Sequence, residues 1–122
     1  MGFKFDNARK RVKIEIEDKT YYATPGAEYE KIAKEYKKKA VEIAEKVETG
    51  EITEDQAENI MFDNTEKEID EILGKGSAEK IFAGRERNAY DWASVLTYIN
   101  SCVYPTNTGK YTSRKRNEYN IR

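Results

Sequence analysis

A long stripe of apolar residues in the first half of the chain restricts the fold more than any other feature of the sequence. From Tyr29 to Val47 apolar residues recur every three or four positions, which places them on one face of an α-helix. The sequence predicts that this helix begins with Thr24 as N-cap and Pro25 at the first helical position. Gly50 is expected to supply the left-handed residue after its end. The stripe consists of Tyr29, Ile32, Ala33, Tyr36, Ala40, Ile43, Ala44 and Val47.

A β-hairpin is predicted ahead of this helix. Residues 11–17 alternate apolar and charged side chains with a period of two, the pattern of a half-buried strand. Asp18 and Lys19 are expected to form a tight turn, after which Thr20 to Tyr22 have the composition of a returning strand. An isolated hairpin is only marginally stable, so this one is expected to pack on the helices or on another subunit. Two residues near the start of the chain are candidates for a third strand, Phe3 and Phe5.

A second, strongly acidic helix is predicted to follow the first. Thr53 and Gln56 have the spacing of a capping box, and Gly74 is expected to close the helix. Between residues 51 and 73 there are nine acidic residues and one basic residue, so the outer face of this segment should repel polyanions. One acidic run within it offers oxygen ligands but lacks the glycine-containing calcium loop, so we interpret it as a solvated helix face and assign no metal. The run is Glu66, Glu68, Asp70 and Glu71.

Two further helices complete the predicted body. Ser77 is expected to cap a short helix over residues 78–83, which Gly84 ends. Asn88, with Asp91 three residues later, is expected to open the last helix. The apolar residues of that helix are Trp92, Val95, Leu96, Ile99 and Val103. The predicted fold class is therefore α+β and mainly helical, with a small N-terminal β-hairpin packed on about four helices.

The chain divides into a predicted domain over residues 1–104 and a flexible basic tail over residues 105–122. The tail has almost no aliphatic content and a net charge of +4, so it is expected to be disordered in isolation. Since the whole chain has a net charge of −1, the body carries −5. Residues 114–116 are basic and lie between two tyrosines, a pattern that fits nucleic acid or a protein partner. The negative body favours the protein partner.

Much of enzyme chemistry is excluded by composition. Histidine is absent, which removes Ser-His and Cys-His catalysis and every metal site that needs imidazole. Cys102 is the single cysteine and lies on an apolar helix face, where a thiol behaves as a small hydrophobe. No apolar run reaches the length of a membrane span and no signal peptide is recognisable, so an intracellular protein is expected.

Two short motifs resemble chemical sites and have simpler interpretations. Ser77 and Lys80 have the S-x-x-K spacing of a lysine-activated serine, but the companion motifs are absent and a helix cap accounts for the serine without a further assumption. Residues 74–77 resemble a phosphate-binding loop, although the lysine lies between the glycines and the segment fits a junction between two helices. We therefore assign no catalytic residue and no cofactor, and expect a protein without enzymatic activity.

Tyrosine is unusually frequent, with nine residues in the chain. Tyrosines are enriched at interfaces because they give a large contact area at low entropic cost. Tyr90 and Tyr98 fall outside the apolar stripe of the last helix and are the better candidates for partner contacts. Aromatic rims around a thin core would account for the tyrosines equally well.

The segment from Ile69 to Gly84 resembles the middle of tail assembly chaperones from long-tailed phages and prophages of Gram-positive bacteria. Those proteins have an acidic-apolar helix end, then Gly-x-Gly, a small residue, Glu-Lys-Ile or a close variant, phenylalanine and glycine. The order of a strand pair, a helical body and a helix after the glycine-phenylalanine turn is also similar. The resemblance is carried by Gly74, Gly76, Ala78, Glu79, Lys80, Ile81, Phe82 and Gly84.

The resemblance implies a non-enzymatic protein of the host cytoplasm that coats the tape measure protein, binds the tail tube protein and is absent from the mature virion. It also implies that a longer form can arise by ribosomal frameshifting. Self-association is expected because the core is thin. The alternatives are a small nucleic-acid-binding regulator that uses the basic tail, or a structural tail subunit that stays in the virion. The residues predicted to contact partners are Ile81, Phe82, Tyr90, Trp92 and Tyr98, although Phe82 fits a core position equally well.

Overall fold

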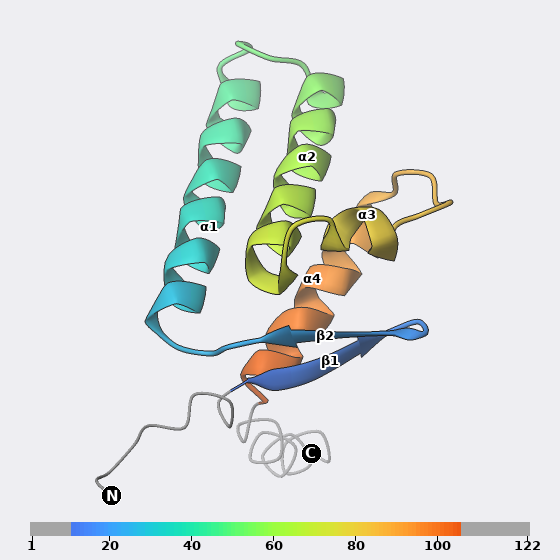
Figure 1. The fold of residues 1–122 in the computed structure, drawn as a ribbon. Coiled ribbons are helices and arrows are strands. Elements are labelled where there is room, and N and C mark those ends of the chain that lie inside the picture. The colour runs from blue at the N-terminus through green and yellow to red at the C-terminus, as the bar shows by residue number, and fades with distance from the viewer. Residues whose placement is uncertain (1–10, 106–122) are drawn as a thin grey trace, which may run out of the picture.

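A computed structural model describes residues 11–105 of the chain. Its elements follow the order β1 (Val12–Ile16), β2 (Lys19–Ala23), α1 (Ala27–Glu48), α2 (Glu54–Leu73), α3 (Ser77–Ile81) and α4 (Ala89–Val103) (Figure 1). The predicted α+β class, an N-terminal hairpin with four helices, is confirmed for this part of the chain. The predicted third strand at Phe3 and Phe5 and the predicted basic tail after residue 105 lie outside the described residues.

The two strands form an antiparallel hairpin in which Ile14 pairs with Tyr21 and Ile16 with Lys19. The two-residue turn is therefore Glu17 and Asp18, one residue earlier than predicted, because Lys19 already pairs with the last residue of β1. Glu17 adopts a left-handed conformation, with φ 56°. Ile14 points into the core and is completely buried, in keeping with the alternation that predicted this strand.

Helix α1 begins two residues later than the sequence indicates. Its N-cap is Gly26, and no side chain caps it, so the predicted roles of Thr24 and Pro25 are wrong. The backbone N–H of Gly26 instead donates to the hydroxyl of Tyr104, 2.9 Å away, at the far end of α4. A contact across the fold thus takes the place of a local cap, which the sequence around residue 24 could not reveal.

Helices α1 and α2 run antiparallel, side by side, and their joined ends extend away from the other elements (Figure 1). The predicted capping box of α2 is confirmed, because Thr53 Oγ1 accepts from the N–H of Gln56 and Gln56 Oε1 accepts from that of Thr53. Gly74 is the C-cap, as predicted. On α2, Phe62 is buried while the preceding residue, Met61, is 37% exposed. Helix α2 contacts α1 on one side and α3, α4 and β2 on another.

The main core lies at the end of the α1–α2 pair that holds the hairpin, α3 and α4 (Figure 1). Ile14 from β1, Ile69 from α2 and Ile99 from α4 are completely buried there. In the part of the chain that the structure describes, no helix combines the length and apolar character needed to cross a membrane. Cys102 is half-buried and packs against the core, in keeping with its expected behaviour as a small apolar side chain.

Candidate functional site

The segment that carries the family resemblance forms the sharp junction between α2 and α3. Gly74 has φ 117° and ψ 149°, and Gly76 has φ 89° and ψ −5°. Residues with a Cβ rarely adopt either conformation, so both glycines are needed for α2 to end and α3 to begin within three residues. The two glycines therefore shape the chain, and no ligand is needed to explain them.

The short helix α3 is capped from a distance. Its N-cap is Gly76, so the prediction that Ser77 caps the helix is wrong; Ser77 is the buried first residue of the helix. Asp70 Oδ1, on the preceding helix, accepts the N–H of Ala78 at 2.8 Å. With Gly76 as N-cap, the N–H of Ala78 belongs to the second residue of the helix, so an acidic side chain from α2 satisfies a group that a local side-chain cap would otherwise satisfy. The helix ends at Ile81 instead of residue 83.

Three of the five predicted partner-binding residues lie inside the core. Ile81, Phe82 and Trp92 are all less than 9% exposed, which corrects the expectation that they form an outer surface. The indole N–H of Trp92 donates to Glu66 Oε2 at 2.9 Å, so even its polar edge is used within the chain. Of the two positions considered for Phe82, the core position is the one found.

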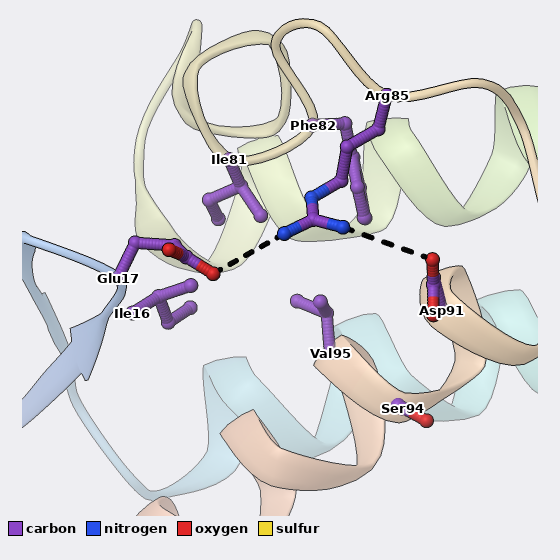
Figure 2. A pocket seen from close by; sticks show the side chains of 8 residues that line it. All are labelled: Ile16, Glu17, Ile81, Phe82, Arg85, Asp91, Ser94 and Val95. Atoms are coloured by element: carbon purple, nitrogen blue, oxygen red, sulfur yellow. Dashed lines mark hydrogen bonds and ion pairs between the residues drawn. The ribbon is translucent and has the colours of Figure 1, made fainter.

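A small pocket nevertheless reaches Ile81 and Phe82 from outside. It encloses about 170 Å³ where the end of the hairpin meets the segment after α3 and the first turns of α4 (Figure 2). Arg85 spans it, with Nη2 3.3 Å from Glu17 Oε2 and Nη1 3.9 Å from Asp91 Oδ2. Its volume lies below the ~300 Å³ at which small-molecule sites begin, so it suits one apolar side chain better than a cofactor.

The remaining predicted contact residues, Tyr90 and Tyr98, are on the surface of α4. Tyr90 is 79% exposed and Tyr98 43%, so the prediction that both fall outside the buried stripe is confirmed. Their contact with a partner stays a prediction.

The acidic run of α2 differs most from its predicted role. Its interpretation as a solvated face is wrong for Glu68, which is only 7% exposed, and incomplete for the other three. Glu66 accepts from Trp92 and from Arg87, Asp70 caps α3, and Glu71 accepts the hydroxyl of Tyr36. Across residues 11–105, no three His, Cys, Asp or Glu side chains are grouped so that they could hold a metal ion.

A longer surface feature, which the sequence did not reveal, runs between α1 and α4. Two adjoining hollows of about 330 Å³ and 530 Å³ share Ala33 and Asn100, and we call their union the α1–α4 furrow. It is lined on the α1 side by residues from Tyr29 to Ala40. The other lining residues are Met61, Asn64, Thr65 and Glu68 of α2 and Leu96, Thr97, Asn100, Ser101 and Tyr104 at or after α4.

Burial changes the acidity of the groups beneath this furrow. It raises the pKa of Glu68 to about 7, with a further contribution from the negative charge of Glu71. Burial also raises the pKa of Tyr29 to about 12, and the Glu68 carboxylate adds to that effect. Tyr36, whose pKa is raised as well, donates to Glu71. The furrow thus has acidic groups, Glu68 and the neighbouring Glu71, at its base, whereas most of its other lining residues are uncharged.

The spacing of α2 contained a signal for the position of Glu68. Ala57, Met61 and Ile72 precede or follow Glu68 by 11, 7 and 4 residues, so all four project from one side of a helix. A glutamate in line with apolar residues differs from one on a fully charged face. The run of neighbouring acidic residues concealed this difference.

The fold and the furrow define a small helical protein with an elongated hollow suited to binding. No family model, curated protein or solved structure matches this chain.

Proposed function

We propose that this chain is a non-enzymatic tail assembly chaperone of a long-tailed phage or prophage, which holds a helical segment of the tape measure protein in the α1–α4 furrow. The likeness of residues 69–84 to such chaperones supports the proposal, and the furrow is the observation that carries it, because it offers the kind of surface this activity needs. The chaperone acts in the host cytoplasm and leaves before the virion is complete.

The dimensions of the furrow suit a helix. Along α1 its lining runs from Tyr29 to Ala40, a span of twelve residues and roughly 17 Å, which is about three helical turns. An amphipathic helix would place anchors from successive turns along such a hollow. Alanine at positions 33 and 40 leaves room for the backbone of the occupant to approach.

The composition of the furrow suits reversible binding. Apolar side chains such as Met61 and Leu96 alternate with short polar ones such as Asn64, Asn100 and Ser101. A lining of this kind gives many small contributions and no large apolar anchor, and affinity depends on such anchors more than on area. A chaperone that has to release its client is expected to bind in this way.

A second contact surface is proposed on the exposed part of α4. Tyr90 and Tyr98 project from this helix, and we assign them to the tail tube protein or to a second copy of the chain. The furrow and these tyrosines are separate sets of residues, so two partners could be held at once.

A pull-down from cells that express the native gene cluster tests the proposal. The tagged full chain is compared with two variants, Ala33→Glu in the middle of the furrow and Ala44→Glu at an exposed position of the same helix that does not line the furrow. Both variants add the same side chain to α1. Proteins are identified by mass spectrometry, with a nuclease-treated control.

Recovery of a very long, helix-rich protein by the wild-type chain and by Ala44→Glu, but not by Ala33→Glu, is the expected result. Recovery of nucleic acid alone, lost on nuclease treatment, would overturn the proposal. Retention of the chain in purified virions would instead identify a structural tail subunit.

A nucleic-acid-binding regulator is the second candidate, and the outer surface of α1 favours it. Lys31, Lys34, Lys37 and Lys38 surround one shallow hollow there, next to the exposed Val41. If these four lysines contact phosphates, the logarithm of duplex DNA affinity should fall with the logarithm of salt with a slope of about −3 to −4. Binding to the tape measure protein should change little over the same salt range.

A further inference from the structure

Among the residues that the structure describes, Glu68 has no partner that would explain its burial. None of the hydrogen bonds or ion pairs formed within residues 11–105 includes its carboxylate. A buried carboxylate without a partner is costly, and natural proteins normally pair such a group. Its presence therefore needs a reason beyond the stability of the fold.

The carboxylate faces the furrow. Within the described residues, Tyr21 Oη is the one buried side-chain atom that is both sealed from solvent and without a hydrogen bond. Since Glu68 also lacks a hydrogen bond to any residue between 11 and 105, its oxygens are assigned to the solvent-facing side, and the lining of the 330 Å³ hollow places that side in the furrow. The carboxylate of Glu68 is thus enclosed by the core on every side except the one that faces the furrow.

The surroundings of Glu68 are arranged to favour a positive charge. Glu71 lies close enough to contribute to the raised pKa of both Glu68 and Tyr36, and it adds a second negative charge beside Glu68. Asn64 and Asn100 line the hollow, and Asn100 Oδ1 accepts the hydroxyl of Tyr29. Lys37 is the lining cation, but it is exposed and forms no ion pair with Glu68.

We infer that the furrow contains a receptor site for one basic side chain, an arginine or lysine presented by a helix of a partner protein, with Glu68 as its counter-ion. The aliphatic stem of such a side chain would lie along Ala40, Met61 and Leu96, and its head would reach the carboxylate. Arginine suits the site best because its planar head can bind a carboxylate through two parallel hydrogen bonds. The site does not depend on the tape measure protein being the partner.

Pairing with a cation would remove the cost of the buried charge. Burial raises the pKa of Glu68 to about 7, so near neutral pH the free protein holds it partly protonated. A bound guanidinium favours the ionised form and lowers that pKa. The complex thus contains a desolvated charge pair inside the 330 Å³ hollow, and such a pair contributes to the specificity of binding.

The test uses n-butylguanidinium as the probe and n-butylurea as its uncharged counterpart. Amide signals of the full chain are followed by NMR at about pH 8, where Glu68 is ionised, during titration with each compound. Glu68→Gln keeps the shape and removes the charge. Glu58→Gln, an exposed position on the same helix, is the matched control.

We expect n-butylguanidinium to shift the signals of Asn64, Thr65, Glu68 and Asn100. Affinity should fall about tenfold or more in Glu68→Gln, since the variant lacks the negative charge that strengthens the hydrogen bonds to the guanidinium. It should be unchanged in Glu58→Gln. Shifts that map elsewhere, that persist in Glu68→Gln, or that n-butylurea reproduces would overturn the inference.

One further variant separates a partner from the basic segment of the chain itself. The full chain with Arg114, Lys115 and Arg116 replaced by Gln should bind the probe with wild-type affinity. Tighter binding in that variant would assign the site to those residues and overturn its assignment to a partner. A positive titration combined with failure to recover a tape measure protein would keep this site and remove the chaperone proposal.

Discussion

Phe82 stacks face to face on Trp92, with ring centroids 3.8 Å apart and ring planes inclined by 8°. Trp92 also packs against Phe62 in a T-shaped arrangement, with ring centroids 5.6 Å apart, and donates its indole N–H to Glu66. One side chain of α4 thus joins α2 to the segment after α3. The end of segment 69–84 is therefore anchored by aromatic packing in the core.

Replacing Phe82 by alanine should destabilise the fold strongly. Removing a buried phenylalanine typically costs about 3–5 kcal/mol, and here the stacked face of Trp92 would also lose its neighbour. Urea unfolding followed by circular dichroism measures the change. Tyr90→Ala is the control, and because Tyr90 is 79% exposed its effect should stay within about 0.5 kcal/mol. Equal stability of the two variants would contradict the core position of Phe82.

The glycines of the motif should differ in their tolerance of substitution. Gly74→Ala forces a Cβ into a backbone conformation that is almost restricted to glycine, which costs about 1–3 kcal/mol. No clash adds to this, because the nearest atom to such a Cβ is Ser77 Oγ at 3.8 Å. Gly76 is left-handed, a region that asparagine tolerates, so Gly76→Asn should cost less. Thermal unfolding compares the two variants, and a larger loss for Gly76→Asn would contradict this ranking.

Asp70 should contribute to stability through one oxygen atom. Asp70→Ala leaves the N–H of Ala78 without its acceptor and is expected to cost about 0.5–2 kcal/mol, as for other helix caps. Asp70→Asn keeps an acceptor oxygen at the same position and should retain most of that stability. Equal losses in the two variants would show that the negative charge matters and that the hydrogen bond does not.

Local patterns in the sequence were sufficient to predict the order and type of the secondary-structure elements. The period of two predicted β1 and the spacing of three and four predicted α1, because each pattern reflects one element placing its apolar side chains on one side. The capping box of Thr53 and the cap at Asn88 were predicted for the same reason, since both are formed within a few residues. Such features depend on neighbours in the chain.

The features that depend on distant residues could not be predicted. Tyr104 takes the place of a cap for α1, and Asp70 takes that role for α3, so the predicted caps at Thr24 and Ser77 were wrong. The furrow likewise needs α1 and α4, which are more than forty residues apart in the chain. Glu68 was misjudged because its neighbours in sequence are acidic, whereas its neighbours in space are largely uncharged.

The buried Glu68 should make stability depend on pH in a direction opposite to that of paired carboxylates. Below its ordinary pKa of 4.5 both folded and unfolded chains hold the proton, so burial of the charge costs nothing. Between 4.5 and about 7 the unfolded chain loses the proton while the folded chain keeps it, so the folded state loses stability as pH rises. Above about 7 the full cost, about 3 kcal/mol, is present.

Comparison of the wild-type chain with Glu68→Gln isolates this contribution, because the other carboxylates titrate equally in both proteins. The two should have similar free energies of unfolding near pH 4, and the variant should be the more stable near pH 8, by up to about 3 kcal/mol. Urea unfolding at several pH values measures the difference. Glu58→Gln, at an exposed position, should show no such pH-dependent gap. A constant difference for Glu68→Gln across this range would mean that the side chain is not desolvated in the folded protein.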